Sequence, residues 1–489
     1  MARPSRVSPL RILAIKRNPT GLLKLLWLIA LLTGEILVFH AATWPCPWPE
    51  HTSWRSIAPH TQPYHIALVA DPQITDQYSY GYSGVLEYLL EFYTDLYMSK
   101  NWRRLNRALR PDAIFFLGDL MDGGREWSEE TRWVAEYKRF MSLFRPLYPE
   151  TTSIYYMAGN HDIGFGEGVR GGVLERFKQY FNTRTSYEVS LGNHSFVILD
   201  TVSLSSHSQE VFAPVAEFLA LVPLPAPGQP RILLTHVPLH RSPSDSCGPL
   251  RGSKGTITQG IGPQYQNLVT AELTRKILET IRPQRVFSGD DHDYCEHVHH
   301  AIIESAAPWL PRTVVQATEI TVNTFSMAQG VRRPGYLLLS LFNPDIFVQS
   351  DPAQDTTGER EAPPTSLVTL CLMPDQLGIY GAYAGLAALT LLALPIAAVA
   401  RFRNGWYRAL ANREEFEMPV FVGRAGDGYE SEEEGRARVR AGAGGMPGGG
   451  LMALVQRREF WKGVAREVGE VVGFGVIVYA VCLVWALVT

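Results

Sequence analysis

The sequence has no excess of charge of either sign. Its 489 residues include 45 Lys and Arg and 48 Asp and Glu, which gives a formal net charge of -3, and no basic stripe is present. A nucleic-acid partner is therefore excluded. Charge is missing altogether from residues 377–400 and 471–488. Each stretch approaches or exceeds the roughly 20 apolar residues that cross a bilayer, so both are predicted to be transmembrane helices.

A third apolar stretch, residues 22–40, carries Lys24 at its start and Glu35 near its end. We interpret it as a transmembrane signal anchor, with a cleaved signal peptide as the alternative because its uncharged core is short. Residues 1–21 contain several basic residues and no acid, so this end is expected in the cytosol. The domain of residues 60–350 is then expected in the lumen.

Other parts of the sequence agree with this topology. Residues 401–470 begin with several Arg, contain an acidic run and are rich in glycine, which predicts a largely disordered cytosolic loop. Asn193 begins an Asn-His-Ser glycosylation sequon in the expected lumenal part. Four of the five cysteines lie in the same part, namely Cys46, Cys247, Cys295 and Cys371. Disulfides are permitted there, and their pairing stays open.

Between the first two apolar stretches, short β-branched and aromatic runs alternate with helix-like stretches. Strands are predicted at residues 65–70, 113–117, 153–158, 196–199, 231–235 and 285–288, with further strands at 314–323 and 335–342. This pattern predicts an α/β fold, a two-layer β-sandwich flanked by helices, in addition to about three transmembrane helices. Ligands are expected beyond the carboxyl ends of the strands.

Small clusters of Asp, Asn, His or Gly follow the first six of these strands. Their candidate metal ligands are Asp71, Asp119, Asn160, His236, Asp290 and His292. Two neighbouring divalent ions require a carboxylate that bridges them and further oxygen and imidazole donors. The ordered set therefore predicts a site for two divalent metal ions, although each cluster alone is an ordinary turn or helix cap.

The order D-x-[HQ], GD, GNH[DE], H and G-[HD]-x-H resembles the calcineurin-like metallophosphoesterase superfamily. The forms ADPQI, FLGDLMDGGR, MAGNHDIG and FSGDDHDYCE are similar to its fungal and animal membrane branch, which includes cell division control protein and the GPI-glycan ethanolamine-phosphate phosphodiesterases. The resemblance implies Mn²⁺-dependent removal of ethanolamine-phosphate from the GPI glycan during maturation and transport of GPI proteins. It also implies GPI lipid or GPI-anchored proteins as substrate, and the endoplasmic reticulum or early Golgi as location.

The resemblance also implies roles for individual residues. Asp71 and His292 would hold the first ion, Asn160 and His236 the second, and Asp119 would bridge them. His161 would be catalytic from outside the metal shell, stabilising phosphoryl charge or protonating the leaving group. In-line attack of an activated water on phosphorus, without a covalent phospho-enzyme, is the expected mechanism.

Two residues depart from the superfamily pattern, which usually has His at both positions. Asp290 keeps a metal donor and favours hard ions such as Mn²⁺, whereas Gln73 either binds metal weakly or orients a water. Asp162, Asp291 and Asp293 are predicted to be partners of the ligand histidines rather than ligands.

These departures keep other functions open. A membrane cargo or sorting adaptor with a degenerate phosphoesterase fold is one alternative, and a lumenal phosphatase of small metabolites is another. Residues 78–102 predict a helix rich in Tyr, Leu and Phe. Its aromatic face either packs against the core or contacts membrane lipid or a lipid-linked substrate.

Overall fold

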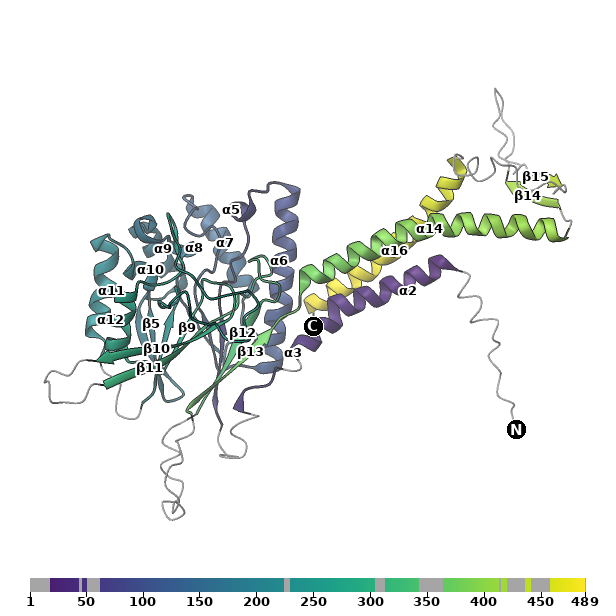
Figure 1. The fold of residues 1–489 in the computed structure, drawn as a ribbon. Coiled ribbons are helices and arrows are strands. Elements are labelled where there is room, and N and C mark those ends of the chain that lie inside the picture. The colour runs from purple at the N-terminus through teal and green to yellow at the C-terminus, as the bar shows by residue number, and fades with distance from the viewer. Residues whose placement is uncertain are drawn as a thin grey trace, which may run out of the picture. The chain divides into compact units, whose positions relative to one another are not determined.

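The computed structural model describes residues 18–43, 46–50, 62–223, 229–303, 313–342, 364–412, 415–419, 436–440 and 458–488. The chain forms two compact units (Figure 1). One, here the central unit, is Leu37–Leu377. The other, here the helical unit, combines Met1–Ile36 with Gly378–Val488.

Two β-sheets form the centre of the central unit, and they confirm the predicted two-layer α/β fold. The five-stranded sheet has the order β13 (Ser366–Leu372), β12 (Gly335–Leu341), β1 (Tyr64–Val69), β2 (Ala113–Phe116) and β3 (Ser153–Tyr156). The six-stranded sheet has the order β10 (Cys295–Ile303), β11 (Thr313–Thr321), β9 (Arg285–Ser288), β6 (Arg231–Thr235), β5 (His194–Leu199) and β4 (Tyr187–Leu191). The sequence did not predict β4, β10 or β13. All three are edge strands, which lack the continuous apolar run of a strand buried on both faces.

The hydrophobic core lies between the two sheets. Alternate residues of the inner strands meet there, as Phe115 of β2 and Phe196 of β5 do with ring centroids 5.3 Å apart. The residues between them point to the helices, so Phe116 packs against Phe140 with ring centroids 5.5 Å apart. Both faces of these strands are therefore buried, which explains their apolar runs.

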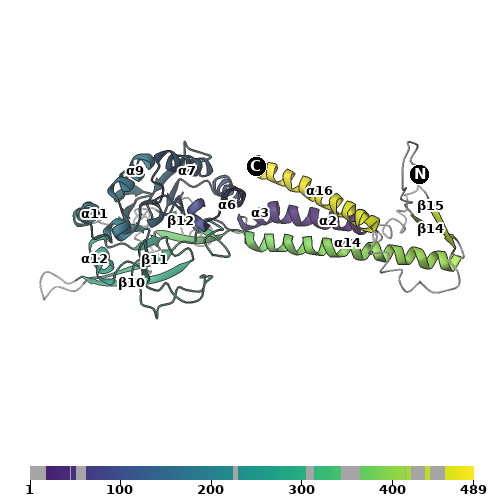
Figure 2. The ribbon, with the colours of Figure 1, turned by 90° about the horizontal axis from the view of Figure 1, so that it is seen from above.

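Helices cover both sheets. They are α3 (Val38–Thr43), α5 (Gln77–Tyr80), α6 (Val85–Arg104) with its π-helical end (Leu105–Leu109), α7 (Glu130–Leu143), α8 (Asn160–Ile163), a 3₁₀ turn (Gly166–Gly168), α9 (Gly171–Phe181), α10 (Thr201–Leu204), α11 (Gln209–Leu221) and α12 (Ala271–Ile281). Helices α11 and α12 lie at one side of the central unit and α6 at the opposite side (Figures 1 and 2). A short hairpin, β7 (Ile261–Gly262) and β8 (Tyr265–Gln266), precedes α12.

Three helical segments are long and apolar enough to cross a membrane, as predicted: Pro19–Thr43, Gln376–Arg401 and Phe460–Ala486. They belong to α2 (Pro19–Leu32) with its π-helical continuation (Thr33–Leu37) and α3, to α14 (Gln376–Asn412) and to α16 (Arg458–Val488). Two hydrogen bonds join polar side chains within the helical unit. Tyr383 donates to Glu35 over 3.0 Å, and Trp27 donates to Thr390 over 3.1 Å. Such pairing offsets the cost of polar groups in an apolar environment.

The stretch 401–470, predicted to be largely disordered, is ordered at several described positions. Helix α14 continues to Asn412, α16 begins at Arg458, and β14 (Glu415–Pro419) pairs with β15 (Arg436–Arg440). The helices extend past the apolar stretches because the flanking Arg, Ala, Leu and Glu residues are good helix formers. The rest of this prediction lies outside the described residues.

Candidate metal centre

The loops that follow β1, β2, β6 and β9 bring five predicted ligands together. Asp71, Asp119 and His292 form one group whose ligand atoms lie within 4.8 Å of one another. Asp119, His236 and Asp290 form a second group within the same limit. Because Asp119 belongs to both groups, its carboxylate is placed to bridge two ions.

His236 is held with one ring nitrogen directed into this cluster. Its Nδ1 donates to the carbonyl oxygen of Leu117 over 2.8 Å, which leaves Nε2 as the ligand atom. This Nε2 lies 3.3 Å from Asp119 Oδ1 and 3.6 Å from Asp290 Oδ1. Asn160 Oδ1 lies 3.1 Å from the same nitrogen. Four donors from four loops therefore converge, including the predicted amide.

The backbone of the site is strained. Five site residues have φ in the left-handed region, between 33° and 68°: Asp71, Gln73, Asp119, Asp290 and His292. This region is unfavourable for residues other than glycine, and such strain is typical of functional sites. Gly159 is needed for close approach, because a Cβ there would lie 2.7 Å from the His236 ring.

Gln73 lies in the site and contacts the shared carboxylate of Asp119. Its Nε2 donates to Asp119 Oδ2 over 2.9 Å. Within the part of the chain that the structure describes, Gln73 Oε1 and Asp71 Oδ2 are buried acceptors without a hydrogen-bond partner. An unpaired buried carboxylate oxygen is costly unless a cation satisfies it. Both atoms therefore fit a metal ion, and Gln73 also positions the bridging carboxylate.

The electrostatics of the site also fit divalent cations. Burial, together with the charge of Asp119, raises the pKa of Asp290 to about 7, although His236 opposes this. Burial likewise raises the pKa of Asp71 well above its usual range. Burial and the neighbouring His161 and His236 lower the pKa of His292 to about 4, so this imidazole is neutral at pH 7. Crowded carboxylates beside a neutral imidazole are the environment that a divalent ion stabilises.

His161 lies beside the cluster and belongs to neither group of metal donors. Its backbone amide donates to Asp119 Oδ1 over 2.8 Å, and its Nδ1 lies 2.9 Å from Asp122 Oδ1. Burial opposes protonation, but the Asp119 charge and the hydrogen bond to Asp122 raise the pKa of His161 to about 9. This raised pKa favours the imidazolium form of His161, from which Nε2 can donate a proton. Asp122 was not predicted from the sequence, although it lies three residues after Asp119 in GDLMD.

The three predicted partners of the ligand histidines have different roles. Asp162 accepts hydrogen bonds from the amides of Leu120, Met121 and Gly159, and so holds the loop that carries Asp119. Asp291 and Asp293 bind the segment of residues 251–253 instead. The prediction is corrected because these carboxylates point to loop backbone and to an arginine rather than to imidazoles.

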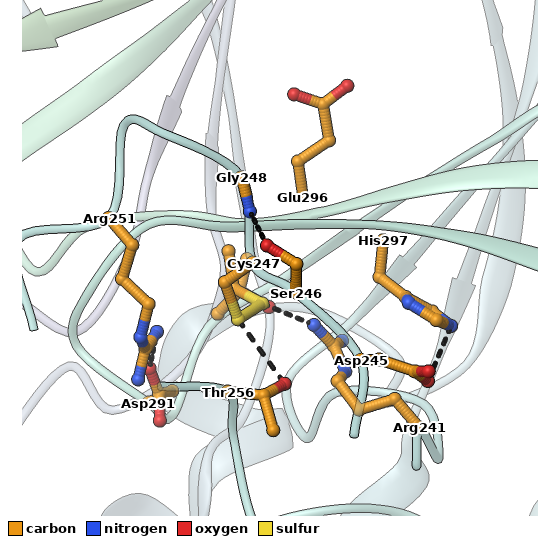
Figure 3. Close-up of a disulfide and its surroundings, with 12 residues drawn as sticks. Arg241, Asp245, Ser246, Cys247, Gly248, Arg251, Thr256, Asp291, Glu296 and His297 are labelled. Carbon is orange, nitrogen blue, oxygen red and sulfur yellow. Dashed lines mark hydrogen bonds and ion pairs between the residues drawn. A yellow bond between two sulfur atoms is a disulfide. The ribbon is translucent and has the colours of Figure 1, made fainter. Parts of the chain in front are cut away.

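A disulfide, an ion pair and a hydrogen bond connect the loop that carries His292 to residues 247–253, which follow His236 in the chain (Figure 3). We call these three contacts the clamp. Cys247 and Cys295 form a disulfide, and Arg251 lies 2.6 Å from Asp291, the residue between two predicted ligands. The amide of Ser253 donates to Asp293 over 2.6 Å. A second disulfide joins Cys46 to Cys371. The clamp therefore fixes the backbone on both sides of His292.

Comparisons with known proteins agree with this geometry. Residues 64–294 match the family model for calcineurin-like phosphoesterases. The chain is 40% identical over 354 residues to cell division control protein 1 of Saccharomyces cerevisiae, which covers 72% of this chain and 68% of that protein. The chain belongs to the calcineurin-like phosphoesterase family. It is also 26% identical to metallophosphoesterase 1 of Macaca fascicularis, over 58% of this chain and 75% of that protein. A solved dimetal phosphatase from Danio rerio is 14% identical with a TM-score of 0.32, over 57% of this chain and 93% of that one.

As a calcineurin-like phosphoesterase, the chain is a metal-dependent phosphoester hydrolase with a dimetal site. Bound divalent ions supply an activated water near neutral pH and neutralise charge on the phosphoryl group. The chain provides the shared carboxylate of Asp119, the orientation of the His236 ring and the His161 imidazole beside Asp122.

Asp122→Asn is expected to move the alkaline limb of the phosphoesterase pH profile to lower pH by roughly one unit. The Asp122 carboxylate raises the pKa of His161, so its loss lets His161 lose its proton at lower pH. The kcat/KM for a soluble phosphodiester, measured against pH, checks this. Glu126→Gln is the matched control, because Glu126 pairs with Arg125 over 3.0 Å rather than with His161. An unchanged alkaline limb in Asp122→Asn would contradict the assigned proton donor.

Replacing both Cys247 and Cys295 by Ser is expected to lower the free energy of unfolding by about 3 kcal/mol, since the disulfide closes a loop of 48 residues. The variant should also lose metal more readily, because the disulfide restrains the His292 loop. Thermal unfolding and metal content after dialysis measure the two effects. Equal metal retention in the variant and the wild type would show that the clamp does not support the site.

Proposed function

We propose that the central unit hydrolyses a phosphodiester on a lumenal, membrane-associated substrate, and that ethanolamine-phosphate on the GPI glycan is this substrate. One observation carries the proposal: two groups of buried and half-buried metal donors share Asp119 in a domain that lies, along the chain, between membrane-length helices. This choice of substrate is supported by the motif forms around Asp71, Asp119, Asn160 and Asp290, because they resemble those of GPI-glycan phosphodiesterases.

In this proposal Asp71 and His292 hold one ion, His236, Asn160 and Asp290 hold the other, and Asp119 bridges them. Oxygen and imidazole donors suit a hard ion such as Mn²⁺. Because its raised pKa favours the cationic form and it stands outside both donor groups, His161 protonates the leaving glycan oxygen or stabilises the phosphoryl oxygens.

Several features support a lumenal location in the endoplasmic reticulum or early Golgi. The basic residues before the first span and after the second favour the cytosol for those flanks. The two disulfides of the central unit fit an oxidising compartment. Asn193 is exposed in the turn between β4 and β5, where a glycan has room.

The test is Mn²⁺-dependent release of ethanolamine-phosphate from a purified GPI glycan by the full-length protein in lipid nanodiscs. We expect release by the wild type and none by Asp119→Asn. A soluble phosphomonoester is assayed in parallel. Equal or faster turnover of the monoester would identify a phosphatase of small metabolites, and no release by a protein that holds two ions would exclude the GPI substrate.

A further inference from the structure

The first half of α6 exposes an apolar surface. Val85, Leu86, Tyr88, Leu89 and Phe92 have side chains that are between 37% and 74% exposed. We call these five residues the outer face of α6. The second half of the helix is different, because Leu96, Tyr97, Met98 and Trp102 are buried in the central unit. Contiguous exposed apolar side chains usually mark an interaction surface.

An ordinary surface helix turns its charged side chains to solvent and its apolar side chains to the protein. In this part of α6 the acids Glu91 and Asp95, spaced four residues apart, face the protein instead. Asp95 lies 2.7 Å from Arg139 of α7, and Glu91 lies 3.9 Å from the same guanidinium. Glu91 and Asp95 therefore bind α6 to α7, and the outer face of α6 is exposed to solvent. Such an arrangement suits an apolar environment around the helix.

The end of a membrane-length segment contacts the second half of α6. Helix α3 is the end of the span Pro19–Thr43, and it packs on α6 inside the central unit. The ring of Phe39 lies 6.0 Å from that of Tyr97, and Lys100 Nζ lies 4.7 Å from the Phe39 ring. The helix that receives the end of the first span is thus the helix that exposes the apolar stripe.

Helix α5, which precedes the outer face in the chain, is connected to the metal centre. Helix α5, four residues before α6, begins after Asp76, whose carboxylate accepts from the amide of Gly123 over 3.1 Å. Gly123 follows Asp122, the partner of His161. Tyr78 of α5 packs edge-on against Trp127 with ring centroids 4.9 Å apart. A lipid held along α5 and α6 would therefore carry its head group toward the proton donor.

We propose that the outer face of α6 inserts into the interfacial layer of the bilayer and delivers lipid-linked substrate to the metal centre. The occupant is membrane lipid. Tyrosine and aliphatic side chains are the composition that favours this layer. Helix α3, the end of the span Pro19–Thr43, packs on the same helix α6. The delivery of substrate rests on the proposed function, whereas the insertion does not.

Insertion is tested on the full-length protein in liposomes with a fluorophore sensitive to polarity. The label is placed on Leu86→Cys in a Cys482→Ala background, because Cys482 is the cysteine outside the two disulfides among the described residues. Leu221→Cys is the matched control, since Leu221 is an exposed leucine at the end of α11. We expect lipids brominated on the acyl chain to quench the label at position 86 at least about threefold more than at position 221.

Delivery is tested with Leu86→Glu/Leu89→Glu against the control Leu221→Glu/Val314→Glu, which also replaces two exposed apolar side chains. Turnover of a soluble phosphodiester should be unchanged in both variants. Turnover of a GPI lipid in liposomes should fall about tenfold or more in the first variant, because two charges then enter the interfacial layer. The control should stay near the wild type.

The outcomes separate the two proposals. If lipid quenches the label at position 86 but the wild type does not hydrolyse GPI lipid, the proposed insertion is supported and the proposed GPI substrate is excluded. The proposed insertion is overturned if the label at position 86 stays in water. It is also overturned if a second copy or a protein partner shields the label and lipid does not quench it. Equal losses in the two double variants would overturn the delivery.

Discussion

Asp119→Asn is expected to reduce phosphodiester hydrolysis about 1,000-fold or more, with the fold retained. Asp119 is the one donor common to both metal groups, so the substitution weakens both. Its two oxygens accept from the His161 amide over 2.8 Å and from Gln73 over 2.9 Å. An Asn side chain has the same shape but places an amide NH₂ group against one of these donors, so it can neither bridge two ions nor accept both hydrogen bonds.

The measurement is the kcat for a soluble phosphodiester together with the metal content of the purified variant. We expect fewer than two ions per chain, and an unfolding temperature equal to that of the wild type when both are measured in metal-free buffer. Asp245→Asn is the control, because Asp245 lies outside the site and 3.7 Å from His297. Full activity in Asp119→Asn would contradict the metal assignment. Normal transport of GPI proteins in cells that carry only Asp119→Asn would favour the cargo adaptor.

His161→Ala is expected to lower kcat by about 100- to 10,000-fold with both ions retained. His161 stands outside both metal groups, and its pKa of about 9 makes it a proton donor at neutral pH. The loss should depend on the leaving group, because an alcohol must be protonated as it leaves whereas a nitrophenolate need not be. Metal content and the rates for the two kinds of ester measure these effects.

The control for this prediction is His207→Ala, since His207 is an exposed histidine paired with Glu167 over 3.1 Å. It should leave both rates unchanged. Loss of metal in His161→Ala would place His161 among the ligands instead. An equal reduction for both kinds of ester would assign it to stabilisation of phosphoryl charge rather than to protonation.

The sequence alone predicted the inner strands and the ligand set, because both depend on local patterns. A strand buried on both faces is a continuous apolar run, and the ligands follow such runs directly, as Asp71 follows β1 and His236 follows β6. Edge strands lack this run. Helix propensity beyond the apolar spans was also underestimated in the stretch from 401 to 412.

Other features depend on contacts between distant segments. The pairing of Cys247 with Cys295 and the ion pair of Arg251 with Asp291 join segments about 40 residues or more apart, and neither segment carries a motif for the other. The apolar side chains of residues 78–102 were compatible with core packing or with lipid contact. Only the position of Arg139 decides that the acids of α6 face inward and its apolar stripe outward.

The most direct test of the two-ion site is the electron paramagnetic resonance spectrum of the metal-free protein during titration with Mn²⁺, recorded alongside phosphodiester hydrolysis. The shared Asp119 predicts two ions per chain, a spin-coupled dinuclear signal, and activity that rises with that signal. In Asp119→Asn the coupled signal should disappear. Full activity with a single ion, or with two uncoupled ions, would contradict the proposed dinuclear centre.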